Sequence, residues 1–386
     1  MTRFCSIFSQ LLQLFSRNDF QKAVQETKAE RHARGFRSWD QFIAMLFCQL
    51  GRAHSLREIC GGLASCEGKL SHVGAKVPRR TTLAYANEHR PWVLYEKVFY
   101  QLLERCQQVA QTKQRRFRFK NKLLSMDGTF IELCAEIFPW AEYSRTKGGV
   151  KLHFTLDHDG YLPTMMVLTT GKGSELAVAR RQNFTPGSIV TFDRGYTDFK
   201  WFNQLTQADV FFVTRLKKVA TFDVVEAREV PENRSVVSDQ LVRFTARRTK
   251  QRYPKLLRLV VIKTEEGQLE FLTNNFKLGA STIARIYKDR WQIELFFKAL
   301  KQNLRVKTFV GTSANALHIQ IWTALIAVLM LKYLQMKAQF GWSFSNLAAL
   351  LGMQLFVYRD LWAWLNDPYT PPPPPAEDLQ ATLSFA

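Results

Sequence analysis

Apolar residues recur at helical spacing through the first part of the chain. Amphipathic helices are predicted for residues 4–15, 39–50, 55–63 and 92–109. Ser55 and Glu58 form a capping box at the start of the third segment, and Gly61-Gly62 can end it. We therefore predict an all-helical N-terminal domain over residues 1–115.

From residue 123 the pattern changes to short apolar and β-branched runs separated by turn residues. Strands are predicted for residues 123–127, 151–156, 164–169, 188–193 and 210–214. Asp159-Gly160 indicates a tight turn between the second and third strands. Helical segments at 174–183 and 198–205 precede and follow the fourth strand. Three strands in a meander, then helix, strand, helix and strand, predict a mixed α/β fold with helices packed on a mixed sheet.

The strand pattern continues beyond this core and then returns to helix. Further strands are predicted for residues 241–248, 256–262 and 269–273, with no helix between them. Helical spacing resumes near residue 281 and continues to about 365, before prolines that favour polyproline II. The predicted divisions after the first domain are 116–216 for the first part of the core, 217–273 for a β-rich insertion, 274–340 for closing helices of the core, and 341–386 for a C-terminal helical segment with a proline-rich tail.

One predicted helix, residues 287–301, carries two distinct faces. At ~100° per residue, a narrow apolar stripe is formed by Ile286, Ile293, Phe297, Leu300 and Leu304. A second stripe, roughly 80° round the helix, consists of Tyr287, Arg290, Glu294 and Lys301. One acid among a phenol and two cations suits the joint binding of a metal ion and a phosphate backbone. The alternative is a solvated face with an Arg290–Glu294 pair.

Charge narrows the classes of partner. The chain has 54 Lys and Arg against 33 Asp and Glu, a net charge of +21, which points to nucleic acid or an anionic membrane surface. The most apolar run, 319–331, is shorter than the ~20 residues of a membrane span. We read it as a core helix and expect no membrane partner. No secretory signal pattern begins the chain, so we expect a cytoplasmic protein associated with the nucleoid.

Two patterns bear on zinc and DNA recognition. The six cysteines show no C-x2-C pairing, which argues against structural zinc. Arg79 and Arg80 open a predicted helix over 78–90, which follows the helix at 55–63 and could form a helix-turn-helix reader of DNA. A plain helical bundle with a basic rim is an equal alternative.

Two aspartates end predicted strands and are closely followed by glycine. Asp127 and Asp193 each follow an apolar run, where a buried charge is costly unless it is paired or bound to metal. If these strands are neighbours, the two carboxylates meet at one edge of the sheet, where Glu294 can join them. Such hard oxygen donors suit Mg²⁺ and a two-metal phosphoryl transfer. A turn-forming or helix-capping role is the alternative for each aspartate.

The spacing Y-x2-R-x3-E-x6-K over residues 287–301 reproduces the signature of the bacterial insertion-sequence-four family of DDE transposases. The motifs around Asp127 and Asp193 resemble the first and second acidic motifs of that family, in order. The segment 39–90 resembles the helical region that precedes the catalytic domain, with looser motifs.

This resemblance implies a ribonuclease-H-like catalytic core, a divalent metal (Mg²⁺, for which Mn²⁺ can substitute), and transposition within a homo-oligomer on double-stranded DNA. The implied catalytic metal ligands are Asp127, Asp193 and Glu294. The implied contacts to DNA phosphates near the cut end are Tyr287, Arg290 and Lys301.

Further DNA contacts are predicted from position alone. Lys147 lies in a basic segment before the second strand, and Arg194 directly follows Asp193. A solvated loop and a salt bridge are the respective alternatives. Members of the family that use a hairpin intermediate hold a flipped base on an aromatic residue. Trp201 or Trp291 could serve here, although a core or interface indole is the better interpretation of each.

We therefore predict a DDE transposase that binds the terminal inverted repeats of an insertion sequence, cleaves the DNA ends and joins the 3′-OH to target DNA. A metal-dependent nuclease of the same fold is the alternative enzyme. A non-catalytic DNA-binding regulator is the alternative of another class.

Overall fold

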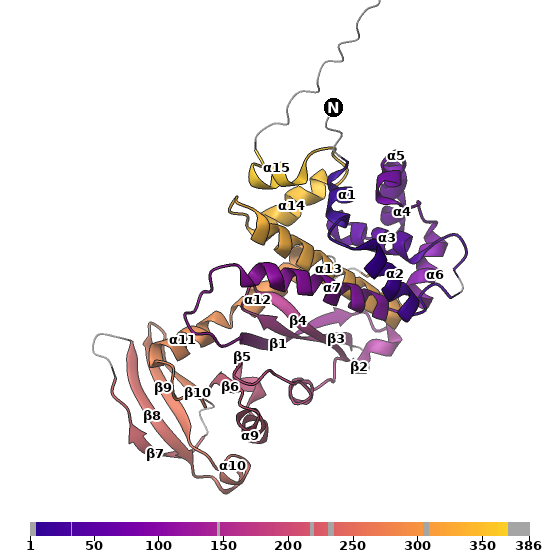
Figure 1. The fold of residues 1–386 in the computed structure, drawn as a ribbon. Coiled ribbons are helices and arrows are strands. Elements are labelled where there is room, and N and C mark those ends of the chain that lie inside the picture. The colour runs from indigo at the N-terminus through magenta and orange to yellow at the C-terminus, as the bar shows by residue number, and fades with distance from the viewer. Residues whose placement is uncertain are drawn as a thin grey trace, which may run out of the picture. The chain divides into compact units, whose positions relative to one another are not determined.

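The computed structural model describes residues 5–31, 33–144, 147–216, 220–230, 235–303 and 309–369 (Figure 1). The chain divides into two compact units. A helical unit comprises the described parts of 1–102, 303–311 and 315–386, and a sheet unit comprises 103–302 and 312–314. The boundary falls within a long helix, α7 (Val93–Gln111).

The helical unit is built from the N-terminal helices together with the C-terminal ones. Its other elements are α1 (Ile7–Leu12), α2 (Arg17–Glu26), α3 (Ser38–Leu50), α4 (Leu56–Ser65), α5 (Glu67–Leu70), the 3-10 helix η1 (Ser71–Val73), α6 (Arg80–His89), α13 (Ala314–Lys337), α14 (Phe344–Gln354) and α15 (Leu361–Asn366). Helix α13 therefore groups with the N-terminal helices, whereas the sequence pattern had assigned residues up to 340 to the core that contains the sheet.

Helix α13 forms the centre of the helical unit. It is long and apolar enough to cross a membrane by length and composition, but 83% of its most apolar stretch is buried inside the protein. The ring of Trp322 lies 5.1 Å from that of Phe99 on α7. Gln320, a polar residue of the apolar run, accepts a hydrogen bond from the backbone of Val310 at 2.9 Å. The burial and the satisfied polar group are those of a core helix, as the sequence predicted.

The helix-turn-helix alternative does not match the connection between α4 and α6. These helices contact each other, but α5 and η1 lie between them in the chain in place of a short turn. Arg79, the residue before α6, and Arg80, its first residue, are both exposed. The region is thus a helical bundle with a basic rim.

The core of the sheet unit contains β1 (Leu123–Leu133), β2 (Glu142–Ser144), β3 (Lys147–Asp157), β4 (Leu162–Thr170), β5 (Ile189–Phe192) and β6 (Phe211–Arg215). Its short helices are η2 (Pro139–Ala141), α8 (Glu175–Ala179), η3 (Arg194–Tyr196) and α9 (Phe199–Gln207). All four residues of β5 are buried, as expected for a parallel strand that is covered on both faces.

The strand order is that of a ribonuclease-H-like fold. β1, β3 and β4 form an antiparallel meander, and β5 and β6 follow beside β1, each parallel to its neighbour. The β3–β4 turn contains Gly160 and Tyr161 with φ of 80° and 52°, in agreement with the turn predicted at Asp159-Gly160. The mixed α/β class and the ribonuclease-H-like core are confirmed.

The insertion consists of β7 (Phe222–Ala227), β8 (Val236–Phe244), α10 (Arg247–Arg252), β9 (Leu257–Thr264) and β10 (Gly267–Thr273). β10 pairs antiparallel with β6, so the insertion extends the core into one ten-stranded sheet. The expectation of no helix between these strands was wrong, because α10 joins β8 to β9. None of its residues is buried, so no apolar periodicity marks it in the sequence.

The single helix predicted over 287–301 is two helices, α11 (Ala280–Asp289) and α12 (Gln292–Asn303). They are separated at Arg290 and Trp291, where the N–H groups of Trp291 and Glu294 bond carbonyls three residues back. The predicted apolar stripe is buried at Ile286, Ile293, Phe297 and Leu300. Leu304 lies outside the described residues.

Candidate active site

Asp127 and Asp193 lie on adjacent parallel strands. The β1–β5 register pairs Met126 with Phe192, and each of these residues directly precedes one of the aspartates. The two strands are therefore neighbours, which is the condition on which the carboxylates could meet. The sequence pattern places Asp127 at the end of its strand. In the structure β1 continues to Leu133, so Asp127 lies within the strand.

The Arg290 guanidinium joins the acid of β1 to the acid of α12. Its Nη1 lies 3.0 Å from Asp127 Oδ2 and 3.6 Å from Glu294 Oε1. The other carboxylate oxygen of Asp127 accepts the N–H of Gly128 at 2.8 Å. Arg290 Nε is buried and has no hydrogen-bond partner among the described residues. The guanidinium is thus not fully bonded within the described part of the chain.

The electrostatics at Asp127 leave its negative charge incompletely compensated. Burial raises the pKa of Asp127 to about 7, and the nearby Glu294 carboxylate acts in the same direction. The Gly128 N–H and the Arg290 guanidinium lower this pKa without offsetting the burial. Additional positive charge at this point would therefore stabilise the carboxylate.

Asp193 caps a helix, which is the alternative role considered for it in the sequence, but it uses only one of its carboxylate oxygens to do so. Its Oδ1 accepts the N–H of Gly195 at 2.5 Å and caps η3. No other group in the described part of the chain bonds or pairs with this carboxylate. The second carboxylate oxygen of Asp193 is therefore unused within the described structure.

The other residues of the signature lie around this pair. The Arg290 guanidinium lies 5.6 Å from the centre of the Tyr287 ring, which packs on Phe271 with ring centres 5.0 Å apart. Burial raises the pKa of Tyr287, and the positive charge of Arg290 opposes this shift. Lys301 is half-buried in the last turn of α12.

Of the two remaining basic candidates near the site, the structure describes the side chain of only one. Arg194 is exposed beside Asp193 and forms no ion pair with any described residue, contrary to its salt-bridge alternative. The side chain of Lys147 lies outside the described part of the structure. Trp201 is buried in the core, with its ring 4.7 Å from that of Phe192, whereas Trp291 is 59% exposed.

Sequence reasoning missed an acid beside the site. Glu175, the first residue of α8, lies so close to Gly128 that a Cβ at position 128 would be 3.1 Å from its Oε1. Its carboxylate pairs with Lys151 at 3.2 Å. The only local signal in the sequence is the Ser174 cap before an acidic first turn, which is common to many helices. Gly128 thus makes room for a further carboxylate next to Asp127.

The donor set has the chemistry that a divalent cation requires, because carboxylate oxygens are the hard ligands that Mg²⁺ prefers. The incompletely compensated charge of Asp127 also fits a cation. The observed geometry centres on Arg290, however, and among the described residues no group of three Asp, Glu, His or Cys side chains is arranged to hold one metal ion.

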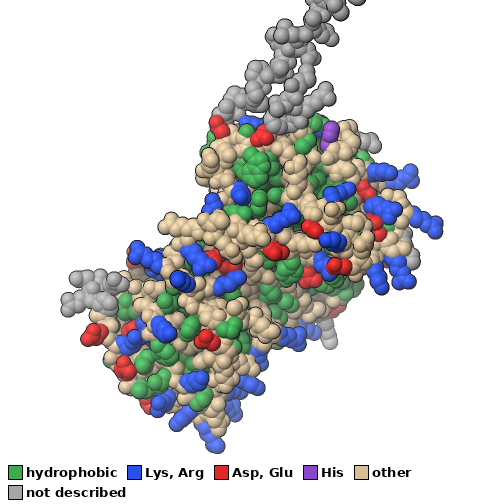
Figure 2. Space-filling model, viewed as in Figure 1, with side chains coloured by type: hydrophobic (Ala, Val, Ile, Leu, Met, Phe, Trp, Pro, Cys, Tyr) green, Lys and Arg blue, Asp and Glu red, His purple; other side chains and the backbone are tan. Residues whose placement is uncertain are grey.

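Basic side chains are distributed widely over the surface. On the face shown in Figure 2, Lys and Arg occur on both units, and several lie at the end formed by the insertion. There, α10 exposes Arg247, Arg248, Lys250 and Arg252. This surface suits a polyanionic partner.

A ribonuclease-H-like sheet with two adjacent aspartates, and with a glutamate on the helix beside them, is characteristic of DDE-class enzymes that act on nucleic acid. The family described as "Transposase DDE domain" matches residues 118–330, more than half of the chain. The chain belongs to this family. A domain of unknown function, DUF4372, matches residues 5–76.

Two relatives are similar over most of the chain. The protein y4zB of Sinorhizobium fredii, whose name assigns it to the transposases, is 29% identical over 312 residues, which are 79% of this chain and 86% of the relative. The probable transposase of insertion sequence element IS5377 from Geobacillus stearothermophilus is 30% identical over 270 residues, 69% of this chain and 70% of the relative. The resemblance to insertion-sequence DDE transposases is confirmed, and the domain implies transposase activity.

A cryo-EM structure of a piggyBac transposase synaptic complex with hairpin DNA aligns with 92% of this chain and 80% of its own, at 12% identity and a TM-score of 0.46.

Proposed function

We propose that this chain binds the terminal inverted repeats of its own insertion sequence, cleaves the DNA ends and joins the freed 3′-OH to target DNA. The DDE domain and the insertion-sequence relatives support this proposal. The observation that carries it is the parallel register that brings Asp127 beside Asp193, with Glu294 linked to Asp127 through Arg290.

In this proposal Asp127, Asp193 and Glu294 hold the divalent cation, Mg²⁺ or Mn²⁺, and are the catalytic residues. A bound divalent ion supplies Lewis-acid stabilisation of the phosphoryl oxygens and activation of the attacking hydroxyl. Two features of the chain support this role: the free oxygen of Asp193 and the uncompensated charge of Asp127.

The basic residues position the DNA. The positive charge of Arg290, whose side chain is 13% exposed, can attract a DNA phosphate while Nη1 stays on the carboxylates, and the Tyr287 ring lies against the guanidinium. Lys301 and the exposed Arg194 extend this contact along the backbone. Lys147, Arg79 and Arg80 are proposed as more distant contacts.

The predicted division of labour completes the proposal. The helical domain of residues 1–115 binds the terminal repeats and assembles the homo-oligomer on double-stranded DNA in the nucleoid. Residues 116–216 and 274–340 supply the catalytic core, with 217–273 inserted and 341–386 as the C-terminal segment.

The test is incubation of the full chain with end-labelled terminal-repeat DNA, target plasmid and Mg²⁺. The repeats are identified as short inverted sequences that bracket the gene. Joined products support a transposase, cleavage alone supports the nuclease alternative, and a shifted but intact band supports the regulator. Asp193→Asn should abolish cleavage.

Asp198→Asn is the matched control. Asp198 lies five residues further on, caps α9 through the N–H of Trp201 at 2.7 Å, and pairs with Arg180 at 2.8 Å. Its substitution should leave cleavage near the wild-type rate. Equal loss of cleavage in both variants would contradict a special role for Asp193.

A further inference from the structure

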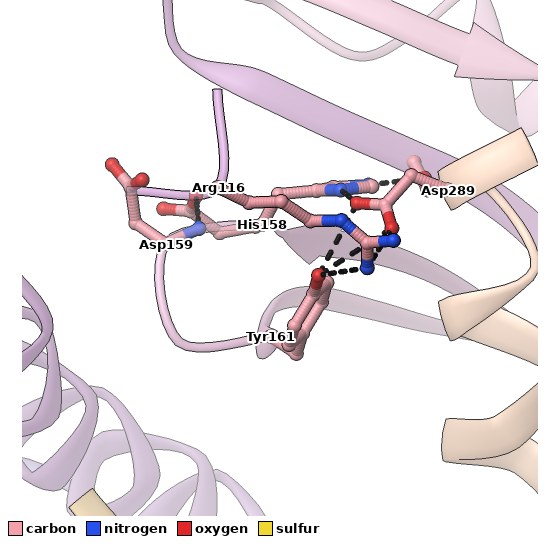
Figure 3. A network of polar contacts seen from close by, with 7 residues as sticks. Arg116, His158, Asp159, Tyr161 and Asp289 are labelled. Atoms are coloured by element: carbon pink, nitrogen blue, oxygen red, sulfur yellow. Dashed lines mark hydrogen bonds and ion pairs between the residues drawn. The ribbon is translucent and has the colours of Figure 1, made fainter. Parts of the chain in front are cut away.

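The turn between α11 and α12 is anchored by a buried polar network (Figure 3). Asp289, the last residue of α11, is only 3% exposed. Its Oδ2 lies 2.7 Å from His158 Nδ1, and its Oδ1 lies 2.6 Å from Arg116 Nη1. The Tyr161 hydroxyl donates to Oδ2 at 3.2 Å. The carboxylate therefore has donors from two other segments of the chain.

The network continues to the strand that carries Asp127. His158 Nε2 lies 2.6 Å from the Oγ of Ser125, two residues before Asp127 on β1. Asp289 in turn directly precedes Arg290, whose guanidinium pairs with Asp127. A continuous set of side-chain contacts therefore links β1 to the turn by a second route, separate from the Arg290 contact.

The order Ser125, His158, Asp289 is that of a hydrolase triad. Ser125 is 0% exposed, however, so its hydroxyl cannot meet a substrate. Asp289 also pairs with Arg116, which such a triad does not require. The network is therefore structural in character.

Asp289 and Arg290 are adjacent in the chain, but they differ in how many of their polar side-chain atoms have a hydrogen-bond partner. Both oxygens of Asp289 are bonded, and a buried carboxylate with several donors is held rigidly. Arg290 makes one bond to Asp127, and its buried Nε has no partner among the described residues. The first residue can thus fix the backbone, whereas the second is less completely bonded.

We propose that Asp289 is a positioning residue: its buried bonds to His158 and Arg116 fix the α11–α12 turn and so hold Arg290 and Glu294 against Asp127. The effect on catalysis rests on the proposed function. The effect on the turn itself does not.

The first measurement is hydrogen–deuterium exchange of the full-length chain. Asp289→Asn keeps the side-chain shape but removes the charge paired with Arg116. Backbone amides of residues 284–297 should exchange at least about tenfold faster than in wild type, because local opening of the turn costs less free energy.

Asp40→Asn is the matched control. Asp40 is also buried, at 7%, and accepts the N–H of Arg37 at 2.8 Å and of Lys76 at 3.0 Å. Both partners belong to the helical unit, and neither has a described contact with the network of Asp289. Exchange over 284–297 should stay at the wild-type rate in this variant. Equally fast exchange in both variants would indicate a general loss of stability and overturn the proposal.

The second measurement is single-turnover cleavage of terminal-repeat DNA. Asp289→Asn should slow cleavage by about 10- to 100-fold, because small misplacements of reacting groups have effects of this size. DNA affinity should change less than twofold, since Asp289 is buried. A loss confined to affinity would overturn the proposal.

Arg116 supplies a second variant in case Asp289→Asn does not fold. Its side chain is 57% exposed, so Arg116→Met should be tolerated. This variant should open the turn and slow cleavage in the same direction, and Arg116→Lys should restore both. Wild-type behaviour of Arg116→Met in both assays would overturn the proposal. Absence of cleavage by the wild-type chain would refute the proposed function, while the exchange data would still decide the role of Asp289.

Discussion

Two arginine–aspartate pairs in the sheet unit, one buried and one partly buried, are built differently. In the insertion, Arg258 binds Asp239 through two bonds, Nε to Oδ1 at 2.8 Å and Nη2 to Oδ2 at 2.7 Å. Its Nη1 donates to the carbonyls of Asn275 at 3.1 Å and Leu278 at 2.5 Å. Arg258 thus ties two strands of the insertion to the segment that leads into α11.

At the candidate active site, Arg290 makes one bond of 3.0 Å to Asp127 and a looser contact of 3.6 Å to Glu294. Its Nε has no partner among the described residues, and burial raises the pKa of Asp127. A guanidinium with all directions bonded stabilises the fold. Arg290, which contacts two acids through a single nitrogen and is incompletely bonded among the described residues, is fixed less firmly.

The contrast extends to the surroundings of each pair. In the described residues of the insertion, 220–230 and 235–273, every buried side-chain nitrogen and oxygen has a partner. In the core, His153 Nδ1 and Thr191 Oγ1 have no hydrogen-bond partner within the described structure, and neither has Arg290 Nε. Within the described sheet unit, the buried groups without a partner therefore lie in the core and its closing helices and not in the insertion.

The largest expected effect is on catalysis. Glu294→Gln, Asp127→Asn and Asp193→Asn should each slow cleavage of terminal-repeat DNA by on the order of 10⁴-fold, and the triple variant should be no slower, because residues that act as one unit are not additive. Binding of the DNA in Ca²⁺ should survive. Glu270→Gln, an exposed acid on β10, is the control and should cleave normally. Near-normal cleavage by Glu294→Gln would remove that residue from the site.

The next largest effect is a difference in the free energy of unfolding between variants of the two arginines. Arg258→Met should lower the free energy of unfolding by about 3–5 kcal/mol, because it leaves Asp239 buried without its partner. Arg290→Met should cost about 1 kcal/mol or less, since Asp127 can take up a proton when the guanidinium is removed. Denaturant unfolding of the full chain measures both. Equal losses would show that Arg290 is as structural as Arg258.

A third effect concerns pH and His153, which is 2% exposed on β3 opposite Gly128. Burial lowers its pKa to about 4. Between pH 6.5 and 4 the unfolded chain binds a proton that the folded chain does not. Stability should therefore fall by up to about 3 kcal/mol as the pH drops through this window, and be unaffected by this group above it.

His153→Gln tests this assignment, because glutamine can keep the bond to Thr169 that His153 Nε2 makes at 2.9 Å but cannot titrate. Unfolding curves from pH 7.5 to 4 should be flatter for this variant than for wild type. The same slope in both proteins would assign the acid sensitivity to other groups.

The smallest effect concerns DNA binding. If Lys301 contacts a phosphate, Lys301→Ala should flatten the slope of log K against log salt by about one unit. Lys263→Ala, at an exposed position on β9 of the insertion, should leave the slope unchanged. Fluorescence anisotropy over a range of salt concentrations measures both. An unchanged slope for Lys301→Ala would favour the solvated-face interpretation of this lysine.

Periodicity and turn chemistry were sufficient to predict much of the fold. Alternation and β-branching identified five of the six described core strands, missing the three-residue β2, and Asp159-Gly160 located the β3–β4 turn. The spacing of residues 287–301 identified the family without any structure. These properties are local: each depends on residues a few positions apart, whose geometry the backbone alone prescribes.

Tertiary structure decided how distant residues meet. Only the parallel register brings Asp127 beside Asp193, and only packing places Glu175 against Gly128. The break between α11 and α12 has no signal in the sequence, because nothing local distinguishes an aspartate in solvent from one that binds His158 inside the protein. α10 was missed for the opposite reason, since a helix without a buried face has no apolar period. Burial and pairing across the chain are properties of the folded molecule, and they determined which of the acids and arginines are structural and which are available for chemistry.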